Sequence, residues 1–477
     1  MTLFLKTSLA LLAAVSLNFS ASAYDFMVDG IYYNKNNDGT TVSVTYEYKS
    51  NSGSNSNYSA LCTQKNGNIV IPNSVSSNGT TYTVSSIGNL AFQNCTGMTS
   101  ITIPNSITSI GREAFYFCTA LPSINIPNSV TSMGYCAFKG CKGLETITIP
   151  NSITSIGDYV FADCTGLTSA EIQNTVIGYG QFERCTKLQT VNNSNSVSTI
   201  SNYSFNDCSG LTTINIPNSI TSIGSYAFNG CSSLAGIIIG NSVTSLGEFA
   251  FYNCRSMTSV TIGRSVTSIQ NSTFCGCSGL TSMVVDNGNN TYDSRGNCNA
   301  IIETATNTLI SGCNTTVIPN MVTSIVEHAF CDRTSLTSIN IPKSVTSISD
   351  YAFRNCTALK SINSYIKLPH YVAMGSSVFY NINKRTCILH VPKDTKSLYK
   401  QEYQWKDFTN IVEDLEDDIN YGDVNGDGDI DVKDVTALIT FILGSEPTGF
   451  VKENADVNVD NEIDVKDVTA LINLILK

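Results

Sequence analysis

Charged residues are scarce in this chain. Only 14% of its 477 residues are Asp, Glu, Lys or Arg, and it contains three His and one Trp. None of the His lies at a metal-ligand spacing from a Cys. The sequence also lacks a Gly-rich phosphate loop, a Gly-x-Ser-x-Gly motif and a zinc motif. These absences predict that the protein is not an enzyme.

Long apolar runs are absent after the first residues. At the start, Lys6 precedes an apolar stretch from Ser8 to Leu17, and the small residues Ala21–Ala23 follow. This pattern predicts a signal peptide over residues 1–23. No later stretch approaches the ~20 apolar residues that span a bilayer. We therefore expect a secreted, extracellular or cell-surface-associated protein without a membrane span.

Acidic charge is concentrated near the C-terminus. Residues 413–477 contain 17 acidic and 4 basic residues, whereas the rest of the chain contains 21 acidic and 23 basic residues. The long N-terminal part is thus almost neutral, and it offers no electrostatic support for a nucleic-acid partner. We assign residues 413–421 to an acidic linker and the rest of the acidity to the segment that follows.

A unit of 23 residues repeats through the middle of the chain. A typical unit opens on Leu-x-x-Ile-x-Ile, the strand pattern of a leucine-rich repeat, and later carries Phe, in most units with Cys three positions further on. One such coil cannot bury its apolar side alone, so neighbouring coils must stack into a continuous core. The Cys that share this position are Cys95, Cys118, Cys141, Cys164, Cys185, Cys208, Cys231, Cys254, Cys277 and Cys356. The fold class that follows is a mainly β solenoid.

Two of the units carry the repeat most clearly. Ser86–Cys95 and Ser222–Cys231 both contain Ile-Gly-x-x-Ala-Phe-x-x-Cys. This arrangement resembles the BspA-like leucine-rich repeats of bacterial surface proteins, and the resemblance covers Ile87 to Cys356. We assign residues 86–361 to the repeats. The resemblance implies an adhesin that engages a protein or glycan on a host or bacterial surface.

The array has two ends and one break. Residues 24–85 alternate polar and apolar positions and predict strands of an N-terminal cap, and residues 362–412, which include Trp405, predict a C-terminal cap. Residues 286–316 replace the regular unit and predict a β-hairpin that projects from the solenoid. Insertions often carry the specific contacts of a solenoid. The hairpin and the rows of Ser, Thr and Asn on the strands are therefore both candidate contact surfaces.

The 17 Cys would ordinarily suggest a disulfide framework in an exported protein. Ten of them occupy one column, however, where equivalent neighbours lie above and below and nothing defines pairs. We favour buried free thiols over a ladder of disulfides, because buried Cys behaves as a small hydrophobe. Adjacent coils are still close enough for disulfides in places. Cys298 and Cys313, which flank the break, are the pair most favoured for a disulfide.

The same acidic twelve-residue loop occurs twice near the C-terminus, 33 residues apart. Oxygen ligands at loop positions 1, 3, 5, 7, 9 and 12 are the EF-hand arrangement for Ca²⁺, with position 7 contributing its backbone carbonyl. The sequence therefore predicts two bound calcium ions. The candidate ligands are Asp423, Asn425, Asp427, Asp429, Asp431 and Asp434 in the first loop, and Asp456, Asn458, Asp460, Glu462, Asp464 and Asp467 in the second.

Each loop runs into a segment with apolar residues at helical spacing. Gly444 is suited to end the first helix. We expect the apolar residues to be buried: Val435, Leu438, Ile439 and Ile442 in the first helix, and Val468, Leu471, Ile472 and Ile475 in the second.

A loop followed by a helix, repeated once and with Asp at position 12, looks like a type I dockerin. The match covers residues 422–477; an acidic linker and a generic calcium sensor are the alternatives. The resemblance implies a small all-α calcium-binding module that binds a cohesin-like module. In this family, positions 10 and 11 contribute to partner choice, and here they are Val432, Lys433, Val465 and Lys466. Family members often carry Ser-Thr there, so the specificity of this module stays open.

Three functions follow from these motifs. The leading one is a secreted, non-enzymatic binding or adhesion protein, in which the solenoid recognises a protein or glycan surface and the calcium-dependent dockerin tethers it to a cohesin-like partner. The alternative is a non-catalytic component of a polysaccharide-degrading, cellulosome-like assembly. In the third, the tail holds calcium and stabilises the C-terminal end without docking anything.

Overall fold

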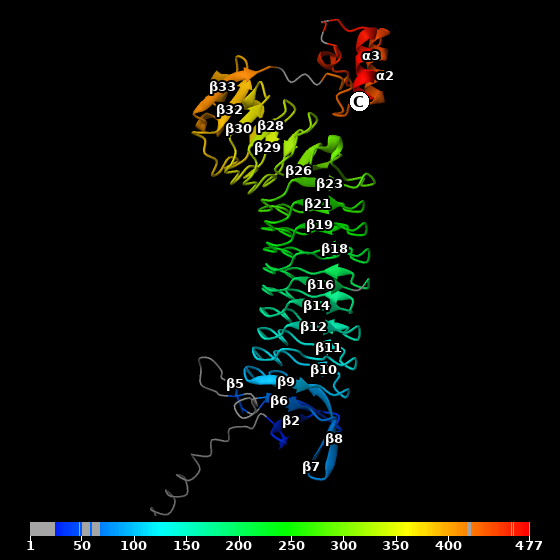
Figure 1. Ribbon diagram of the computed structural model, residues 1–477, viewed down its shortest axis with the longest axis vertical. Helices are drawn as coiled ribbons and strands as arrows, with labels where there is room; N and C mark the ends of the chain where they lie inside the picture. Colours follow the sequence, from blue (N-terminus) through cyan, green and yellow to red (C-terminus); the bar gives the residue numbers. More distant parts are fainter. Residues whose placement is uncertain are drawn as a thin grey trace, which may run out of the picture.

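The chain folds into a tall stack of thin coils with a small helical module at its C-terminal end (Figure 1). The structure, a computed structural model, describes residues 24–46, 48–49, 58–59, 67–193, 195–416, 421–458, 460 and 462–476. The predicted mainly β solenoid is confirmed. The predicted signal peptide, residues 1–23, lies outside the described residues. None of the described helices is long and apolar enough to cross a membrane.

Each regular coil contributes short strands that pair in parallel with the equivalent strands of the next coil. Thr146 pairs with Ser169 and Ser132 pairs with Ser155, in both cases at a step of 23 residues. A turn follows the first strand position of a coil and begins at a proline in many coils, as where the N–H of Ile153 donates to the carbonyl of Pro150. The sequence period is therefore the stacking period of the solenoid.

The N-terminal strands form one eight-stranded sheet and two pairs. The sheet contains β1 (Phe26–Val28), β2 (Ile31–Lys35), β3 (Thr41–Thr45), β7 (Ser74–Ser77), β8 (Thr80–Ile87), β10 (Ser109–Ile110), β11 (Ser132–Met133) and β13 (Ser155–Ile156). The pairs are β4 (Tyr48–Lys49) with β5 (Tyr58–Ser59), and β6 (Gly67–Val70) with β9 (Met98–Thr102). Because β3 pairs in parallel with β8, the strands expected as an N-terminal cap continue directly into the stack.

The middle coils form three parallel sheets. They are β12 (Thr146–Ile149), β14 (Ser169–Ile172) and β16 (Thr190–Asn193); β15 (Val176–Ile177), β17 (Thr199–Ile200), β18 (Ser222–Ile223), β20 (Ser245–Leu246) and β22 (Ser268–Ile269); and β19 (Gly236–Ile238), β21 (Ser259–Ile262) and β23 (Ser282–Val285).

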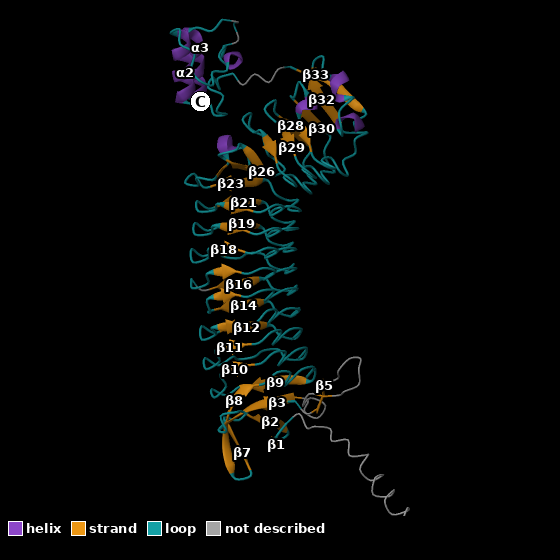
Figure 2. Cartoon of the chain, turned by 180° about the vertical axis from the view of Figure 1, so that it is seen from behind, coloured by secondary structure: helices purple, strands orange, loops and turns teal. Residues whose placement is uncertain are grey.

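The last coils form two further sheets. They are β24 (Tyr292–Asp293), β25 (Ala300–Glu303), β26 (Thr308–Gly312), β27 (Ser324–Ile325), β29 (Ser347–Ile348) and β31 (Ala373–Met374); and β28 (Ser338–Ile341), β30 (Ser361–Ser364), β32 (Ile388–Pro392) and β33 (Asn410–Leu415). The helices are η2 (Arg295–Asn297), η3 (Pro369–Tyr371), α1 (Lys396–Tyr399), η4 (Trp405–Asp407), α2 (Val432–Ile442), η5 (Lys452–Asn454) and α3 (Val465–Ile475). Figure 2 shows short strands joined by loops along the solenoid, and the two long helices in the C-terminal module.

A column of stacked Phe rings runs through the core. From Phe92 to Phe274, the ring centroids of successive Phe lie 4.9–5.7 Å apart, and the rings are nearly parallel. The column resumes with Phe330 and ends on Phe379 against the buried Trp405, at 5.0 Å. Trp405 thus packs against the last ring of the column.

The Cys column lies beside these rings. Nine of its ten members are free and buried, as favoured from the sequence. Each donates its thiol to the carbonyl of the Phe one coil before, as Cys208 does to Phe182 at 3.0 Å. Burial raises the pKa of the Cys208 thiol well above its usual value. The exception is Cys95, which is disulfide-bonded. The free thiols of the column are therefore buried groups that pack and hydrogen-bond inside the core.

Every coil places two residues in the left-handed backbone region, two positions before and two after its Phe. Around Phe205 these are Tyr203 and Asp207, with φ of 59° and 57°. Their N–H groups donate to the carbonyls of Ser225 and Asn229 in the next coil. Left-handed geometry is costly for a residue with a side chain, and these hydrogen bonds between coils offset that cost.

The break at residues 286–316 forms the predicted hairpin, but the hairpin does not project. Its strands β25 and β26 pair antiparallel, and β26 then pairs in parallel with β27 of the next coil. Tyr292 is buried, and its hydroxyl accepts a hydrogen bond from the N–H of Ile269 at 3.2 Å. The hairpin is therefore built into the stack, which changes direction near β26 (Figure 1). The core divides there into two clusters.

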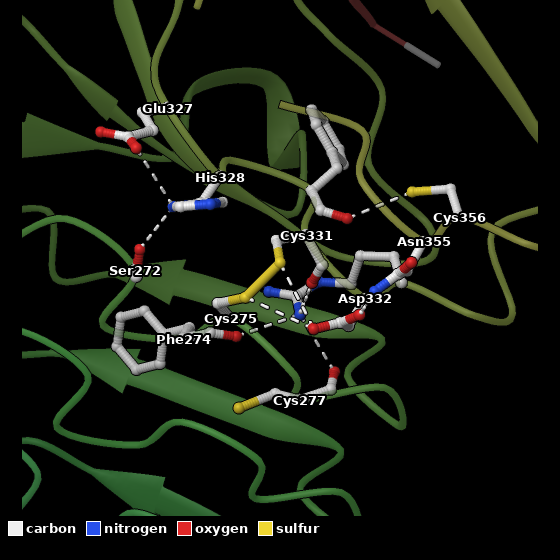
Figure 3. The surroundings of a disulfide bond; sticks show 12 residues. Ser272, Phe274, Cys275, Cys277, Glu327, His328, Cys331, Asp332, Asn355 and Cys356 are labelled. Atoms are coloured by element: carbon white, nitrogen blue, oxygen red, sulfur yellow. Dashed lines mark hydrogen bonds and ion pairs between the residues drawn. A yellow bond between two sulfur atoms is a disulfide. The ribbon is translucent and has the colours of Figure 1, made fainter. Parts of the chain in front are cut away.

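The disulfide predicted between Cys298 and Cys313 is wrong, because both residues are free and buried. The bond instead joins Cys275 to Cys331, which are 56 residues apart (Figure 3). Each of these two directly follows the Phe of its coil. The inserted hairpin separates the coils in sequence while they stay neighbours in space. A Cys at the same repeat position on both sides of the break was the signal that sequence reasoning missed.

Arg333 occupies the place in its coil where the others carry Cys. Its side chain is fully buried. Nη1 donates to the carbonyl of Phe274 at 3.0 Å, the acceptor that a thiol would use here, and Nε donates to Gly312 of the hairpin at 2.8 Å. The guanidinium therefore ties the hairpin and both coils together. We call the Cys275–Cys331 bond and Arg333 the joint of the solenoid.

Removing the disulfide should loosen the joint. For Cys275→Ser with Cys331→Ser, we expect the free energy of unfolding to fall by about 2–4 kcal/mol, which is typical for the loss of a native disulfide. Amide exchange around Phe274 and Phe330 should accelerate more than exchange in the middle coils. The control is Cys208→Ser, which keeps a hydroxyl donor for the Phe182 carbonyl. Equal exchange in both variants would contradict a bracing role.

Candidate calcium loops and partner face

The first acidic loop is closed by its last residue, Asp434. This carboxylate is fully buried. One of its oxygens accepts hydrogen bonds from the N–H groups of Val424 at 2.8 Å and Asn425 at 3.0 Å, and the other accepts from Asp431 at 2.8 Å. Asp467 binds its own loop in the same way, through Asn458 at 3.1 Å and Asp464 at 2.8 Å. The carboxylate at position 12 thus links the beginning of each loop to its position 9.

Within each loop, side-chain oxygens accept from N–H groups two residues later. Asn425 accepts from Asp427 at 2.7 Å, and Asp427 accepts from Asp429 at 3.1 Å. In the second loop, Asn458 accepts from Asp460 at 2.9 Å and Asp460 accepts from Glu462 at 3.0 Å. These turns wind both loops tightly. Gly428, at position 6 of the first loop, has a φ of +88° and supplies the left-handed turn expected there; its counterpart, Asn461, lies outside the described residues.

Position 9 begins each helix. Asp431 and Asp464 are the N-caps of α2 and α3, and both helices carry a complete capping box with the Asp at position 12. A carboxylate at this place satisfies free N–H groups and interacts favourably with the positive end of the helix. Each loop and the helix that follows it thus form one structural unit, and the module contains two such units.

The donor chemistry of both loops fits a hard cation. Their side chains offer only oxygen, and calcium prefers six to eight oxygen ligands. The pKa of the Asp434 carboxyl is raised by its burial, so the ionised form is costly without a nearby cation. At position 7, the Glu462 side chain is exposed, which suits a residue expected to contribute its backbone carbonyl.

The candidate ligands do not gather tightly in either loop. Among the described residues, neither loop brings three carboxylates within 4.8 Å of one another. Instead, the ammonium group at position 11 lies against two of them. Lys433 Nζ is 3.1 Å from Asp427 and 3.2 Å from Asp431, and Lys466 Nζ is 3.2 Å from both Asp460 and Asp464.

The two helices bury one face and expose another. Leu438 and Leu471 are fully buried between them. The expected burial of Ile439 and Ile472 is wrong, because each is 40% exposed. They share an open side with Val432 and Val465, which are 70% and 67% exposed, and with Leu443 and Leu476. We call these six residues the apolar stripes. Helical spacing alone cannot separate a buried stripe from one left open for a partner.

The solenoid offers a polar surface. The rows expected on its strands are exposed, as at Thr99, Ser100, Thr212 and Thr213. A cavity of about 270 Å³ lies beside the hairpin and is lined in part by Arg295 and Asn340 of the solenoid and by Gly428 of the first acidic loop. Arg295 is not free to move, because Asp293 and Asn307 bind its guanidinium. Both surfaces suit recognition better than chemistry.

The joint also brings together Ser272, His328 and Glu327 (Figure 3). The Ser272 hydroxyl lies 2.7 Å from His328 Nδ1, and the Glu327 carboxylate lies 3.7 Å from the same nitrogen. A relay triad needs the acid and the hydroxyl on opposite ring nitrogens. This arrangement is therefore not a catalytic triad. Nearby, Cys275, Cys331 and Asp332 offer ligand atoms within 4.8 Å, but the two sulfurs are bonded to each other.

Comparison with protein families identifies both parts of the chain. Residues 85–212, 198–306 and 307–412 match the BspA type Leucine rich repeat region, in six copies. Residues 421–476 match the Dockerin type I domain. Neither domain is catalytic, and no enzyme domain is found. Type I dockerins bind Ca²⁺ in general and imply a cohesin partner, and both domains are typical of extracellular or surface proteins.

One solved structure supports the fold. A leucine-rich repeat protein from Bacteroides ovatus is 28% identical, with a TM-score of 0.56, over 82% of this chain and 100% of that chain. A leucine rich cell surface protein from Faecalibacterium prausnitzii is 22% identical, with a TM-score of 0.41, over 82% of this chain and 95% of that chain. No curated relative matches the chain. The chain belongs to the BspA-type leucine-rich repeat family and carries a type I dockerin domain after its repeats.

Proposed function

We propose that this is a secreted adhesion protein whose solenoid binds a protein or glycan surface and whose dockerin tethers it to a cohesin-like partner. The observation that carries the proposal is the pairing of a long, nearly uncharged polar solenoid with a module that exposes two equivalent apolar stripes. The sequence before residue 24 supports export. Membership of a polysaccharide-degrading assembly, again without catalysis, is the second candidate, and the dockerin favours it.

In this proposal the dockerin holds two calcium ions, one per loop. The ligands are Asp423, Asn425, Asp427, Asp429, Asp431 and Asp434 in the first loop, and Asp456, Asn458, Asp460, Glu462, Asp464 and Asp467 in the second. Bound calcium would neutralise the clustered carboxylates and contribute folding free energy. The N–H groups bound to Asp434 and Asp467 keep these carboxylates oriented toward their loops.

The partner would contact Val432 and Lys433 of α2 or Val465 and Lys466 of α3. Both pairs are exposed and occupy the same positions of two closely similar loops, so either helix can occupy the same partner site. The exposed stripes support this contact, since aliphatic groups left open on a small module mark an interaction site.

A charge placed on both stripes should release the partner. For Val432→Asp with Val465→Asp, we expect capture of a cohesin by the full chain to fall by at least tenfold, because each carboxylate would be desolvated in the contact. Surface plasmon resonance in calcium measures this loss, and chelator should abolish capture by the unaltered chain. The control is Val317→Asp, at a solenoid valine that is 65% exposed. Retained capture by the stripe variant would contradict the proposed face.

The solenoid ligand calls for a separate experiment. Glycan and surface-protein arrays, probed with the full chain in calcium and again in chelator, distinguish the two ends of the molecule. Signals that persist in chelator belong to the solenoid, because the calcium loops lie outside it. Array binding confined to plant polysaccharides would favour the second candidate function.

A further inference from the structure

The lysines at position 11 pair with the same two loop positions in both loops, and Lys466 also lies 3.9 Å from Glu462. Lys433 pairs with Asp427 and Asp431, and Lys466 pairs with Asp460 and Asp464, at 3.1–3.2 Å. These carboxylates are positions 5 and 9 of the proposed calcium loops. The repetition follows from the residues that the two loops share, because positions 5, 9 and 11 are Asp, Asp and Lys in both.

The ammonium groups and calcium compete for the same oxygens. A lysine that bridges two carboxylates of a metal-free loop offsets part of their mutual repulsion. A divalent ion attracts these carboxylates more strongly and repels the ammonium. Both lysine side chains are more than 60% exposed, so each can leave its loop without a large desolvation cost.

We propose that Lys433 and Lys466 are calcium-released contacts for an acidic partner face. Without calcium, each lysine is held by its own loop. With calcium bound, it is free to pair with a carboxylate of the partner beside the exposed Val432 or Val465. The inference rests on the proposed calcium-dependent docking and adds to it the charge of the surface that docks. A partner site for this module therefore combines an apolar patch with carboxylates.

The reactivity of the two lysine side chains measures whether calcium releases them. In the full chain, acetylation of Lys433 and Lys466 by a water-soluble reagent, followed by mass spectrometry, should be several-fold faster in calcium than in chelator, because pairing shields an ammonium from reaction. Lys452, an exposed lysine outside both loops, is the internal control and should react at one rate. Equal or slower labelling of Lys433 and Lys466 in calcium would overturn the proposal.

Calcium affinity gives the second readout. For Lys433→Gln with Lys466→Gln, calorimetry should show calcium binding tightened by roughly two- to tenfold, which is the effect of removing two partly exposed ion pairs from each loop. The gain should shrink in 1 M salt. Lys452→Gln should bind calcium as the unaltered chain does. Unchanged or weaker binding by the double variant overturns the inference, whereas absence of calcium binding by the unaltered chain overturns the proposed function itself.

Discussion

Replacing Asp434 and Asp467 by Ala should abolish calcium binding and partner capture together. Each carboxylate is proposed as the position-12 ligand, and each also accepts N–H groups that close its loop. Removing one carboxylate leaves these donors without their acceptor. Each donor that stays buried should lower the free energy of unfolding by about 1–3 kcal/mol. The N-terminal turn of α2 or α3 should therefore fray even without metal. Calorimetry measures the lost calcium binding, and far-ultraviolet circular dichroism measures the lost helix.

The matched control for this experiment lies inside the same loops. Asp429→Asn with Glu462→Gln changes the side chains at position 7, where the backbone carbonyl is the expected ligand. We expect at most a modest loss of calcium affinity and unaltered helix content. If this control lost calcium as completely as the position-12 variant, ligand geometry would not explain either result.

Phe205→Ala should weaken the solenoid more than any surface change. The Phe205 ring lies between Phe182 at 5.5 Å and Phe228 at 5.3 Å, and it is fully buried. Truncation opens a cavity against two neighbouring coils, and we expect the free energy of unfolding to fall by about 3–5 kcal/mol. Because each coil contacts only its neighbours, the damage should be greatest within one or two coils. Denaturant unfolding and hydrogen exchange measure its size and extent.

Two further variants test the interpretation. Phe205→Leu keeps most of the buried volume and should lose clearly less stability than Ala. Thr213→Ala, on the exposed surface of the solenoid, should change stability by less than about 0.5 kcal/mol. If Phe205→Ala lost no more stability than Thr213→Ala, the ring column would not be what holds the coils together.

The repeats could be predicted because their signal is local and recurs. The residues that form the strand, the turn and the buried Phe all lie within one repeat, so the stacking of Phe182, Phe205 and Phe228 follows from the period alone. The acidic loops could be predicted for the same reason, since twelve consecutive residues carry the pattern. Both features need no knowledge of distant contacts.

The joint and the apolar stripes could not be predicted from such local patterns. The Cys275–Cys331 bond depends on which coils become neighbours after the hairpin is inserted, and Cys298 and Cys313 only flank it in sequence. The exposure of Ile439 depends on how α2 packs against α3, where Leu438 takes the buried place. A helical period fixes which residues share a face, but the packing of the two helices decides which face is covered.

The uniform step of the Phe column makes the solenoid a spacer of adjustable length. Each added coil would lengthen the stack by about 5 Å, close to the separation of paired strands. A gain or loss of 23 residues anywhere in the regular array would keep every ring, thiol and left-handed turn in place. It would alter only the distance between the first strands and the docking module. The reach of the anchored protein can therefore change in single-coil increments, independently of what it holds at either end.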